Sequence, residues 1–310
     1  MRPLPHETTA SYLNRLAHTY RTTTADLLDG LGITTGTRTA PAAPGTAELH
    51  LDTTAQLRLA AFTRTPPDNL AQALPHLTNH PSARLRTPST NPGPAGATVA
   101  GAAPRATAAW QPLEPGEQPV RACPACTRRH TQGATGHALL HPPPHQALCP
   151  LHQHWSLDPR HSLDTRALPE LTAAHSSHQR LNRHPRAATA TSWATAITTR
   201  WYDQQTHLTN RWQHRLKRLT DANPHAAPTG RSWALYARTL VTYPETITLA
   251  RALAQARLPD QPRQGPLPAT HPAITAFLHH TAHQLHLPRL APPPTDLLWT
   301  WIHQARPTNS

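Results

Sequence analysis

The sequence predicts a mainly α-helical protein with an N-terminal helical domain resembling a helix-turn-helix, a small cysteine-containing module and a C-terminal helical domain. Apolar residues recur at helical spacing on both sides of the centre of the chain. All three cysteines fall in that centre, and a stretch rich in Pro, Thr, Ala and Gly precedes it. Such a stretch cannot bury enough apolar surface to order itself and is typical of a linker. We therefore expect four segments: an N-terminal domain (1–80), a linker (81–109), the cysteine-containing module (110–165) and the C-terminal domain (166–310).

Several short helices are predicted in the N-terminal domain. The first runs from Ser11 to Tyr20, and Thr8 or Thr9 can cap its start. At the second, Thr23 is a capping residue and Asp26 places a carboxylate in the first turn. The connection between them has the length of a helix-turn-helix, a feature that most small helical domains share. Two further helices, Thr53 to Phe62 and Asp68 to Leu74, complete an all-helical N-terminal domain.

The central module contains a metal-ligand pattern, C-x2-C followed by 22 residues and C-x2-H. The four residues are Cys123, Cys126, Cys149 and His152. Two short-spaced pairs at this separation are typical of zinc sites. Three thiolates and one neutral imidazole complete a tetrahedral shell without water, as in structural zinc sites. We therefore expect one structural Zn²⁺ in a zinc finger or ribbon.

The fourth ligand is less well defined by the sequence than the three cysteines. Spacing selects His152, but five other histidines lie nearby, namely His130, His137, His141, His145 and His154. A disulfide is the alternative to a metal, and an odd number of cysteines would leave one thiol without a partner.

Helical periodicity returns after the central module. One helix is expected over 168–184, and a longer one over Thr189 to Thr220, where Trp193, Trp201 and Trp212 belong to an apolar stripe. Proline in the sequence TYP separates the next two segments, which form a second candidate helix-turn-helix. These and the last two helices are expected over Ser232 to Val241, Glu245 to Arg257, Pro272 to Leu287 and Thr295 to Gln304.

The formal net charge of +13 is concentrated in residues 166–310, which hold 16 basic and 6 acidic residues. A segment of this kind favours double-stranded DNA as a partner through neutralisation of phosphates, although a basic surface also aids solubility. Arg211, Arg215 and Arg218 recur at helical spacing beside Lys217. We expect these four residues to form a basic ridge that contacts phosphates, with a solvated helix face as the alternative.

Composition also bears on the cellular compartment. No apolar run approaches the roughly 18 residues of a membrane span, and the N-terminus lacks the apolar centre of a signal peptide. Thiolate ligands fit a reducing cytoplasm. We expect a cytoplasmic protein without a membrane partner, associated with the nucleoid when bound to DNA.

A metal-dependent hydrolase is the main catalytic alternative. His141 and His145 repeat the spacing of zinc proteases, but the three prolines between them prevent a helix and no glutamate lies between them. Walker A, G-x-S-x-G and G-x-G-x-x-G motifs are missing, and the 16 acidic residues are scattered. We therefore expect no enzyme activity and no catalytic residues.

The opening segment ETTASYLNRLA resembles the E-S-x-x-S-W-L-x-R-L-A motif of the TniQ family, with Tyr12 in place of tryptophan and Thr8 where serine is frequent. The matching residues are Glu7, Ser11, Leu13, Arg15, Leu16 and Ala17. The segments CPAC and LCPLHQHW are similar to the C-P-x-C and C-P-x-H of the same family, and they follow in the same order. This resemblance covers roughly the first 160 residues.

The resemblance implies a DNA-binding accessory protein of transposition. Such a protein recognises a target site or recruits other proteins to it, while separate transposase and ATPase subunits carry out the chemistry. The chain has cysteines for one zinc site where some relatives have two, and a long proline-rich insertion precedes that site. A stand-alone zinc-containing transcription regulator is the alternative function.

Overall fold

A computed structural model describes residues 1–36, 45–75, 77, 105–114, 117–156, 161–225, 231–256 and 271–304. The chain divides into two compact units: an N-terminal unit (1–152 and 156–162) and a C-terminal unit (153–155 and 163–310). Each unit is described by itself. The part of the expected linker from position 81 to position 104 lies outside the described residues.

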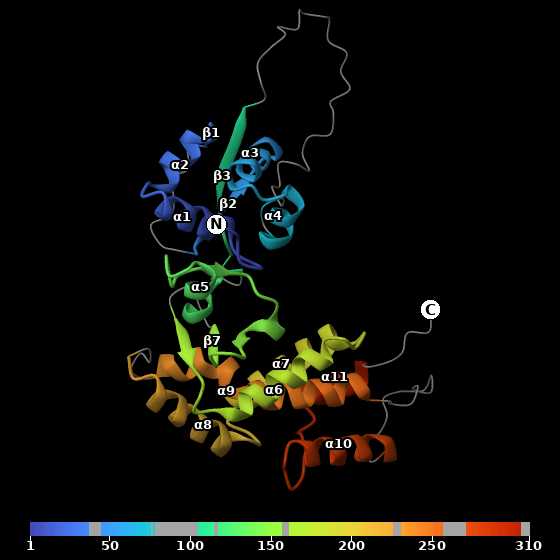
Figure 1. The fold of residues 1–310 in the computed structure, drawn as a ribbon. Coiled ribbons are helices and arrows are strands. Elements are labelled where there is room, and N and C mark those ends of the chain that lie inside the picture. Colours follow the sequence, from blue (N-terminus) through green and yellow to red (C-terminus); the bar gives the residue numbers. More distant parts are fainter. Residues whose placement is uncertain are drawn as a thin grey trace, which may run out of the picture. The chain divides into compact units, whose positions relative to one another are not determined.

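The N-terminal unit contains a small sheet between helices. Strand β3 (Ala106–Pro112) is the central strand, parallel to β1 (Ile33–Thr35) and antiparallel to β2 (Ala47–Leu51). Figure 1 shows α1 and α2 on one side of β3 and α3 and α4 on the other. These helices span Thr9–Thr19 (α1), Thr24–Gly30 (α2), Thr53–Thr63 (α3) and Pro67–Ala73 (α4).

Local capping chemistry explains where these helices begin. The Thr8 hydroxyl accepts a hydrogen bond from the backbone N–H of Ser11 at 3.0 Å, which satisfies a donor left free at the start of α1. Thr23 and Asp26 form a reciprocal capping box at α2. The predicted helices are confirmed, whereas their use as a helix-turn-helix stays a prediction.

Strand β3 shows that two predictions are wrong. The N-terminal domain is not all-helical, and the expected linker does not extend to position 109, because β3 begins at Ala106. Ala106 and Ala108 are almost fully buried, and the Thr34 hydroxyl donates to the carbonyl of Ala106, 72 positions further along the chain. Small side chains allow a central strand to pack closely between helices. Because the pairing partners are so distant in sequence, the local composition of this strand resembles that of a linker.

The core of the N-terminal unit joins α1 and α2 to the sheet and to α3 and α4. It contains the largest fully buried side chains of this unit, among them Tyr12, Leu13, Leu16, Leu28, Leu49, Leu51, Leu59, Leu70 and Leu74. Each large apolar side chain that is fully buried stabilises a fold by roughly 1.5–3 kcal/mol. This core fixes the position of α1, which carries the family-like opening motif.

Short elements follow in the cysteine-containing part of the N-terminal unit. Strand β4 (Val120–Arg121) pairs antiparallel with β5 (Leu139–Leu140), and α5 (Pro124–His130) lies between them in the sequence. A 3-10 helix covers Pro144–Gln146, and β6 covers Leu148–Cys149. The chain passes between the units at β7 (His154–Ser156) and β8 (Ser162–Asp164).

The described part of the C-terminal unit is helical apart from these short strands, and the protein is mainly α-helical, as predicted. Its helices span Pro169–Leu181 (α6), Ala187–Asp203 (α7), Thr209–Ala222 (α8), Arg231–Gln255 (α9), Pro272–Gln284 (α10) and Leu297–Gln304 (α11). Helix α9 is the central element and contacts α6, α7, α8 and α10. Trp201 and Trp212 are fully buried, which confirms that these two belong to the core, whereas Trp193 is only half-buried.

Two helices, α7 and α8, replace the single helix expected over Thr189 to Thr220. The chain turns between them at Gln205 and His207, which both adopt the left-handed backbone conformation. The rings of Tyr202 and Trp212 lie 5.7 Å apart, whereas ten residues of continuous helix would separate them by about 15 Å. The fold-back packs both ends of the apolar stripe into one core, which a straight helix cannot do.

Helix α9 is continuous through Pro244, so the expected pair of helices split at TYP, with its second helix-turn-helix, is wrong. Proline lacks an N–H and crowds the preceding turn, which normally breaks a helix. Here the guanidinium of Arg215 donates to the carbonyl of Val241, three residues before Pro244. Hydroxyls of Thr242 and Thr246 each donate to the carbonyl four residues earlier. These contacts add donors to the turns on either side of Pro244.

Within the described residues, no helix has the length and apolar character needed to cross a membrane.

Candidate metal centre

Two turns bring the four predicted ligands together. Cys123 precedes α5, whose first residue is Pro124, and Cys126 lies in the first turn of that helix. Cys149 ends β6, and His152 follows three residues later. Proline is favoured at the first position of a helix because its missing N–H is not needed there. The same C-P motif that identifies the pattern in the sequence therefore also sets the start of α5.

Four of the separations among the ligand atoms are close to those of a tetrahedral site. His152 Nδ1 lies 3.5 Å from Cys123 Sγ, 3.3 Å from Cys126 Sγ and 3.6 Å from Cys149 Sγ, and the sulfurs of Cys126 and Cys149 are 3.6 Å apart. All four atoms lie within 4.8 Å of one another. A tetrahedral ion with Zn–S of about 2.3 Å and Zn–N of about 2.0–2.1 Å separates its ligands by roughly 3.5–3.8 Å. The arrangement is therefore compatible with a metal site, and three sulfurs with one imidazole nitrogen are a donor set that suits zinc.

The three thiols differ in pKa because their hydrogen bonds and burial differ. A bond from the Cys123 thiol lowers the pKa of Cys149 to about 4, and the same contact raises the pKa of Cys123. Burial raises the pKa of Cys126, while Arg129 opposes that rise. Backbone N–H groups of Cys126 and His152 point at the sulfurs of Cys123 and Cys149. One thiolate forms readily, and the charge of a bound cation is what would ionise the other two.

The competing histidines lie outside this cluster, which is the only group of potential metal ligands among the described residues. His137 approaches Arg121 at 3.4 Å, and the Nε2 of His141 lies 3.9 Å from a carboxylate oxygen of Glu48. His130 is exposed at the end of α5. The geometry therefore selects the same fourth residue, His152, as the spacing does.

The family-like opening motif forms a buried polar network at the start of α1. Arg15 donates from Nε to Glu7 Oε1 at 2.7 Å and from Nη2 to Oε2 at 2.6 Å. Ser11 Oγ also donates to Oε1 at 3.0 Å, and the backbone N–H of Leu4 donates to Oε2 at 2.8 Å. Glu7 and Arg15 are 0% and 4% exposed. Glu7, Ser11 and Arg15, the polar residues that match the family motif, thus bond to one another inside the protein.

This network is continuous with the metal-ligand turns. Ser11 Oγ accepts a hydrogen bond from the N–H of Leu139 at 2.9 Å, and the N–H of Thr8 donates to the carbonyl of Leu139 at 2.9 Å. Leu139 belongs to β5, whose neighbour Ala138 accepts from the N–H of Ala122 at 2.9 Å, next to Cys123. The two sequence motifs, separate in the chain, therefore build one structural assembly.

The sequence alone gave no sign of one buried acid in the same unit. Glu48 of β2 is fully buried, and its Oε1 accepts from the N–H groups of Ala10 and Leu49. Burial, with a smaller contribution from the nearby charge of Glu7, raises the pKa of Glu48 to about 7 against the opposing effect of backbone hydrogen bonds. Strand β2 is missing from the sequence prediction, so no local signal placed this carboxyl group inside the protein.

The four residues of the expected basic ridge have different environments. Arg215 is only 4% exposed and pairs with Glu245 and Glu170. Arg211 donates to the carbonyl of Leu285 at 2.8 Å, and Arg218 pairs with Glu170 at 3.2 Å. Lys217 is exposed on the outer face of α8. Three of the four cations are therefore engaged by the protein itself.

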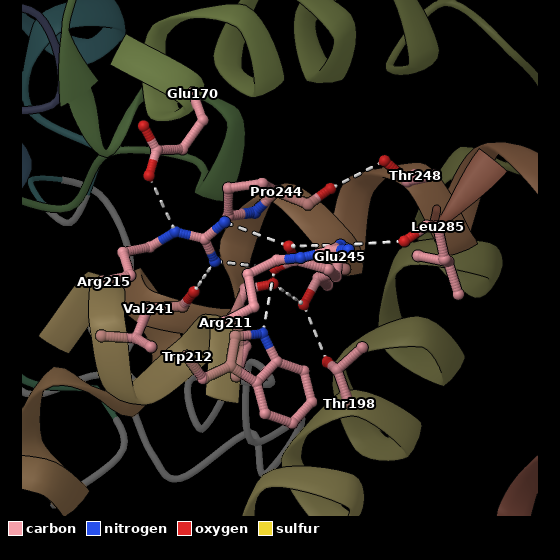
Figure 2. A network of polar contacts seen from close by, with 12 residues as sticks. Glu170, Thr198, Arg211, Trp212, Arg215, Val241, Pro244, Glu245, Thr248 and Leu285 are labelled. Carbon is pink, nitrogen blue, oxygen red and sulfur yellow. Dashed lines mark hydrogen bonds and ion pairs between the residues drawn. The ribbon is translucent and has the colours of Figure 1, made fainter. Parts of the chain in front are cut away.

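Figure 2 shows how this second polar network is arranged, with Arg215 between Glu170 and Glu245. Arg215 donates from Nη1 and Nη2 to the two oxygens of Glu245, at 2.8 and 3.0 Å. The indole N–H of Trp212 donates to Glu245 at 3.0 Å, and Arg211 lies 3.5 Å from the same carboxylate. Burial lowers the pKa of Arg215, but the carboxylates of Glu245 and Glu170 outweigh this effect and raise the pKa above its usual value. The network joins α6, α8 and α9.

The N-terminal unit thus combines helices and a small sheet with a Cys3His cluster that is compatible with a metal site. A family model, described as TniQ, matches residues 1–155, half of the chain, and the chain belongs to the TniQ family. This membership links it to transposition. No curated protein and no solved structure matches the chain.

Proposed function

We propose that the chain is a zinc-containing, DNA-binding accessory protein of transposition that recognises a target site or recruits other subunits to it. The observation that carries this proposal is the family match over residues 1–155 together with the Cys3His cluster inside the matched region. The protein itself contributes binding and positioning, and separate transposase and ATPase subunits are the proposed partners that carry out strand transfer.

In this proposal Cys123, Cys126, Cys149 and His152 hold one structural Zn²⁺. Four protein ligands leave no open position for water, so the ion supplies folding energy and no chemistry. Apparent zinc-binding energies in small modules are about 10–16 kcal/mol at neutral pH. That energy would hold the two ligand turns together and, through β5, would keep α1 and its buried network in place.

DNA binding in the proposal depends on charge. The formal net charge is +13, and each phosphate neutralised by a cation releases counterions, so affinity must fall as salt rises. Contacts to phosphates would set the affinity and orientation, while contacts to bases would set the choice of site. Of the expected ridge, Lys217 is the exposed cation that stays available for such a contact.

The direct test measures binding of the full chain to a fluorescein-labelled DNA duplex by fluorescence anisotropy. The NaCl concentration is varied from 50 to 300 mM, which shortens the Debye length from about 14 to about 6 Å. The proposal predicts that the logarithm of the association constant falls linearly with the logarithm of salt concentration. A chain that is folded and metal-loaded but does not bind duplex at the lowest salt would contradict direct DNA contact and would favour recruitment through protein partners alone.

A further inference from the structure

The turn between α6 and α7 carries the densest group of exposed cations in the described part of the C-terminal unit. Arg180, Arg183 and Arg186 occur within seven positions and are all exposed. No acidic residue lies between Glu170 and Asp203 in the sequence. The turn therefore carries three positive charges with no negative charge on the same segment.

These three side chains are not used to hold the fold together. Arg180 donates to a neutral group, the hydroxyl of Ser177, at 3.2 Å. Neither Arg183 nor Arg186 has a side-chain hydrogen bond or ion pair with any described residue. By contrast, Arg238 pairs with Asp203 at 2.7 Å. Three like charges on one exposed segment create a local positive potential that attracts a polyanion.

A hollow of about 490 Å³ adjoins this turn. Ser177, the partner of Arg180, lines the hollow, and Arg251 of α9 and Arg211 of α8 line it too. Arg251 is exposed, and within the described residues its guanidinium has no partner. Arg180 therefore connects the turn to the hollow through Ser177.

The carboxylates in the hollow do not cancel this charge. Glu170 and Glu245 line it, but Arg215 and Arg218 already pair with Glu170, and Arg215 and the Trp212 indole occupy Glu245, as Figure 2 shows for Arg215 and Trp212. Arg211 also lies 3.5 Å from Glu245, so Arg251 is the cation of the hollow that is left without a partner among the described residues. Arg211 and Arg215 hold helices together, whereas Arg251 is exposed beside the hollow.

We propose that Arg180, Arg183, Arg186 and Arg251 form a phosphate-contacting surface for the DNA backbone, which we name the α6–α7 basic surface. This inference rests on the proposed DNA binding and assigns that binding to residues outside the expected ridge. Guanidinium groups suit the contact because their N–H donors pair with two phosphate oxygens at once. The amino end of α7, where no side chain caps the helix, adds partial positive charge at the same place.

The test is a triple variant of the full chain, R180A/R183A/R186A, in the duplex-binding salt series. If all three contact phosphates, the slope of log K against log salt should become shallower by up to about 2.7, and affinity at 0.15 M salt should fall on the order of 100-fold. Arg251→Ala alone should lower the slope by about 0.9. Because all four side chains are exposed, the circular dichroism spectra should match that of the wild type.

A matched control variant removes the same charge elsewhere in the chain. R105A/R166A/R289A deletes three other exposed cations that have no proposed contact with DNA, and it should keep the wild-type slope within experimental error. An equal loss in both triple variants would show diffuse charge attraction and overturn the inference. The inference would also be overturned if polyglutamate competed for the protein as strongly as unlabelled duplex of equal total charge, because that result would indicate an acidic protein partner.

The outcomes separate this inference from the proposed function. If the wild type and the R180A/R183A/R186A variant bind duplex with the same slope, the α6–α7 basic surface is wrong while DNA binding stands. If the wild type does not bind duplex at all, both fail.

Discussion

The two units each bury an arginine to the same extent, but they use it differently. Arg15 and Arg215 are both 4% exposed. Arg15 meets a single carboxylate, Glu7, with both oxygens engaged. Arg215 lies between Glu170 and Glu245, which also pair with other arginines, Arg218 and Arg211 respectively. The first is a closed pair, and the second is a shared network.

This difference teaches how an arginine in a sequence should be interpreted. The closed pair belongs to the family-like motif, in which the spacing from Glu7 to Arg15 is part of the recognised pattern. The shared network involves partners 30 and 45 positions from Arg215, on α9 and α6. Helical spacing correctly placed Arg215 on one helix face, but it could not show that this face meets two acidic side chains.

The largest effect is expected for Arg15→Ala, which breaks the closed pair. Glu7 would keep the Ser11 hydroxyl and the Leu4 amide but, among described residues, no cation. Leaving a buried carboxylate unpaired costs about 3–5 kcal/mol. Urea denaturation combined with hydrogen exchange of the α1 amides measures the loss. The double variant E7Q/R15M should be less destabilised than Arg15→Ala, and a loss below about 1 kcal/mol for Arg15→Ala would mean that the pair does not support the fold.

A smaller loss is expected for Arg215→Ala, because the network has alternatives. Glu245 would keep Arg211 and the Trp212 indole, and Glu170 would keep Arg218. We expect a loss of about 2–4 kcal/mol in the free energy of unfolding. Tryptophan fluorescence in urea follows it, since seven of the eight tryptophans lie in the C-terminal unit.

Lys217→Ala is the matched control for Arg215→Ala, two residues away on the outer face of α8. An exposed substitution of this kind should change stability by no more than about 0.5 kcal/mol. Equal effects of the two substitutions would contradict the buried role of Arg215 and would return it to the expected ridge.

The last effect concerns the N-terminal unit and depends on pH, because it appears only as Glu48 ionises. Burial raises the pKa of Glu48 from 4.5 to about 7, so the folded state holds its proton more tightly than the unfolded state does. The associated stability is fully present below about pH 4.5 and is lost as the pH rises through about 7. Glu48→Gln should therefore become more stable than the wild type across this window, by up to about 3 kcal/mol. Identical pH slopes for the two proteins would argue against a buried, proton-holding Glu48.

Features encoded within a few residues could be predicted from the sequence. The capping box of Thr23 and Asp26 needs only a three-residue spacing, and α2 begins where that spacing places it. The spacing of Cys149 and His152 likewise selected the fourth member of the cluster among several histidines.

Features that depend on distant partners could not be predicted in this way. Ala106 and Ala108 form a strand only because β1 and β2 lie on either side. Pro244 stays within α9 while Arg215, from another helix, bonds to the carbonyl of Val241. In each case the missing information is the identity of the neighbour in space.

The most direct test of the account is the metal content of the purified full chain, measured by mass spectrometry for the wild type, Cys149→Ser, His152→Ala and the control His130→Ala. The account predicts one zinc per chain in the wild type and in His130→Ala, since His130 lies outside the cluster. It predicts loss of zinc in Cys149→Ser and weakened retention in His152→Ala, with reduced exchange protection of α1 in both because β5 connects the ligand turns to Ser11. A wild-type chain that is folded and contains no zinc, or His152→Ala that retains zinc as well as His130→Ala does, would contradict it.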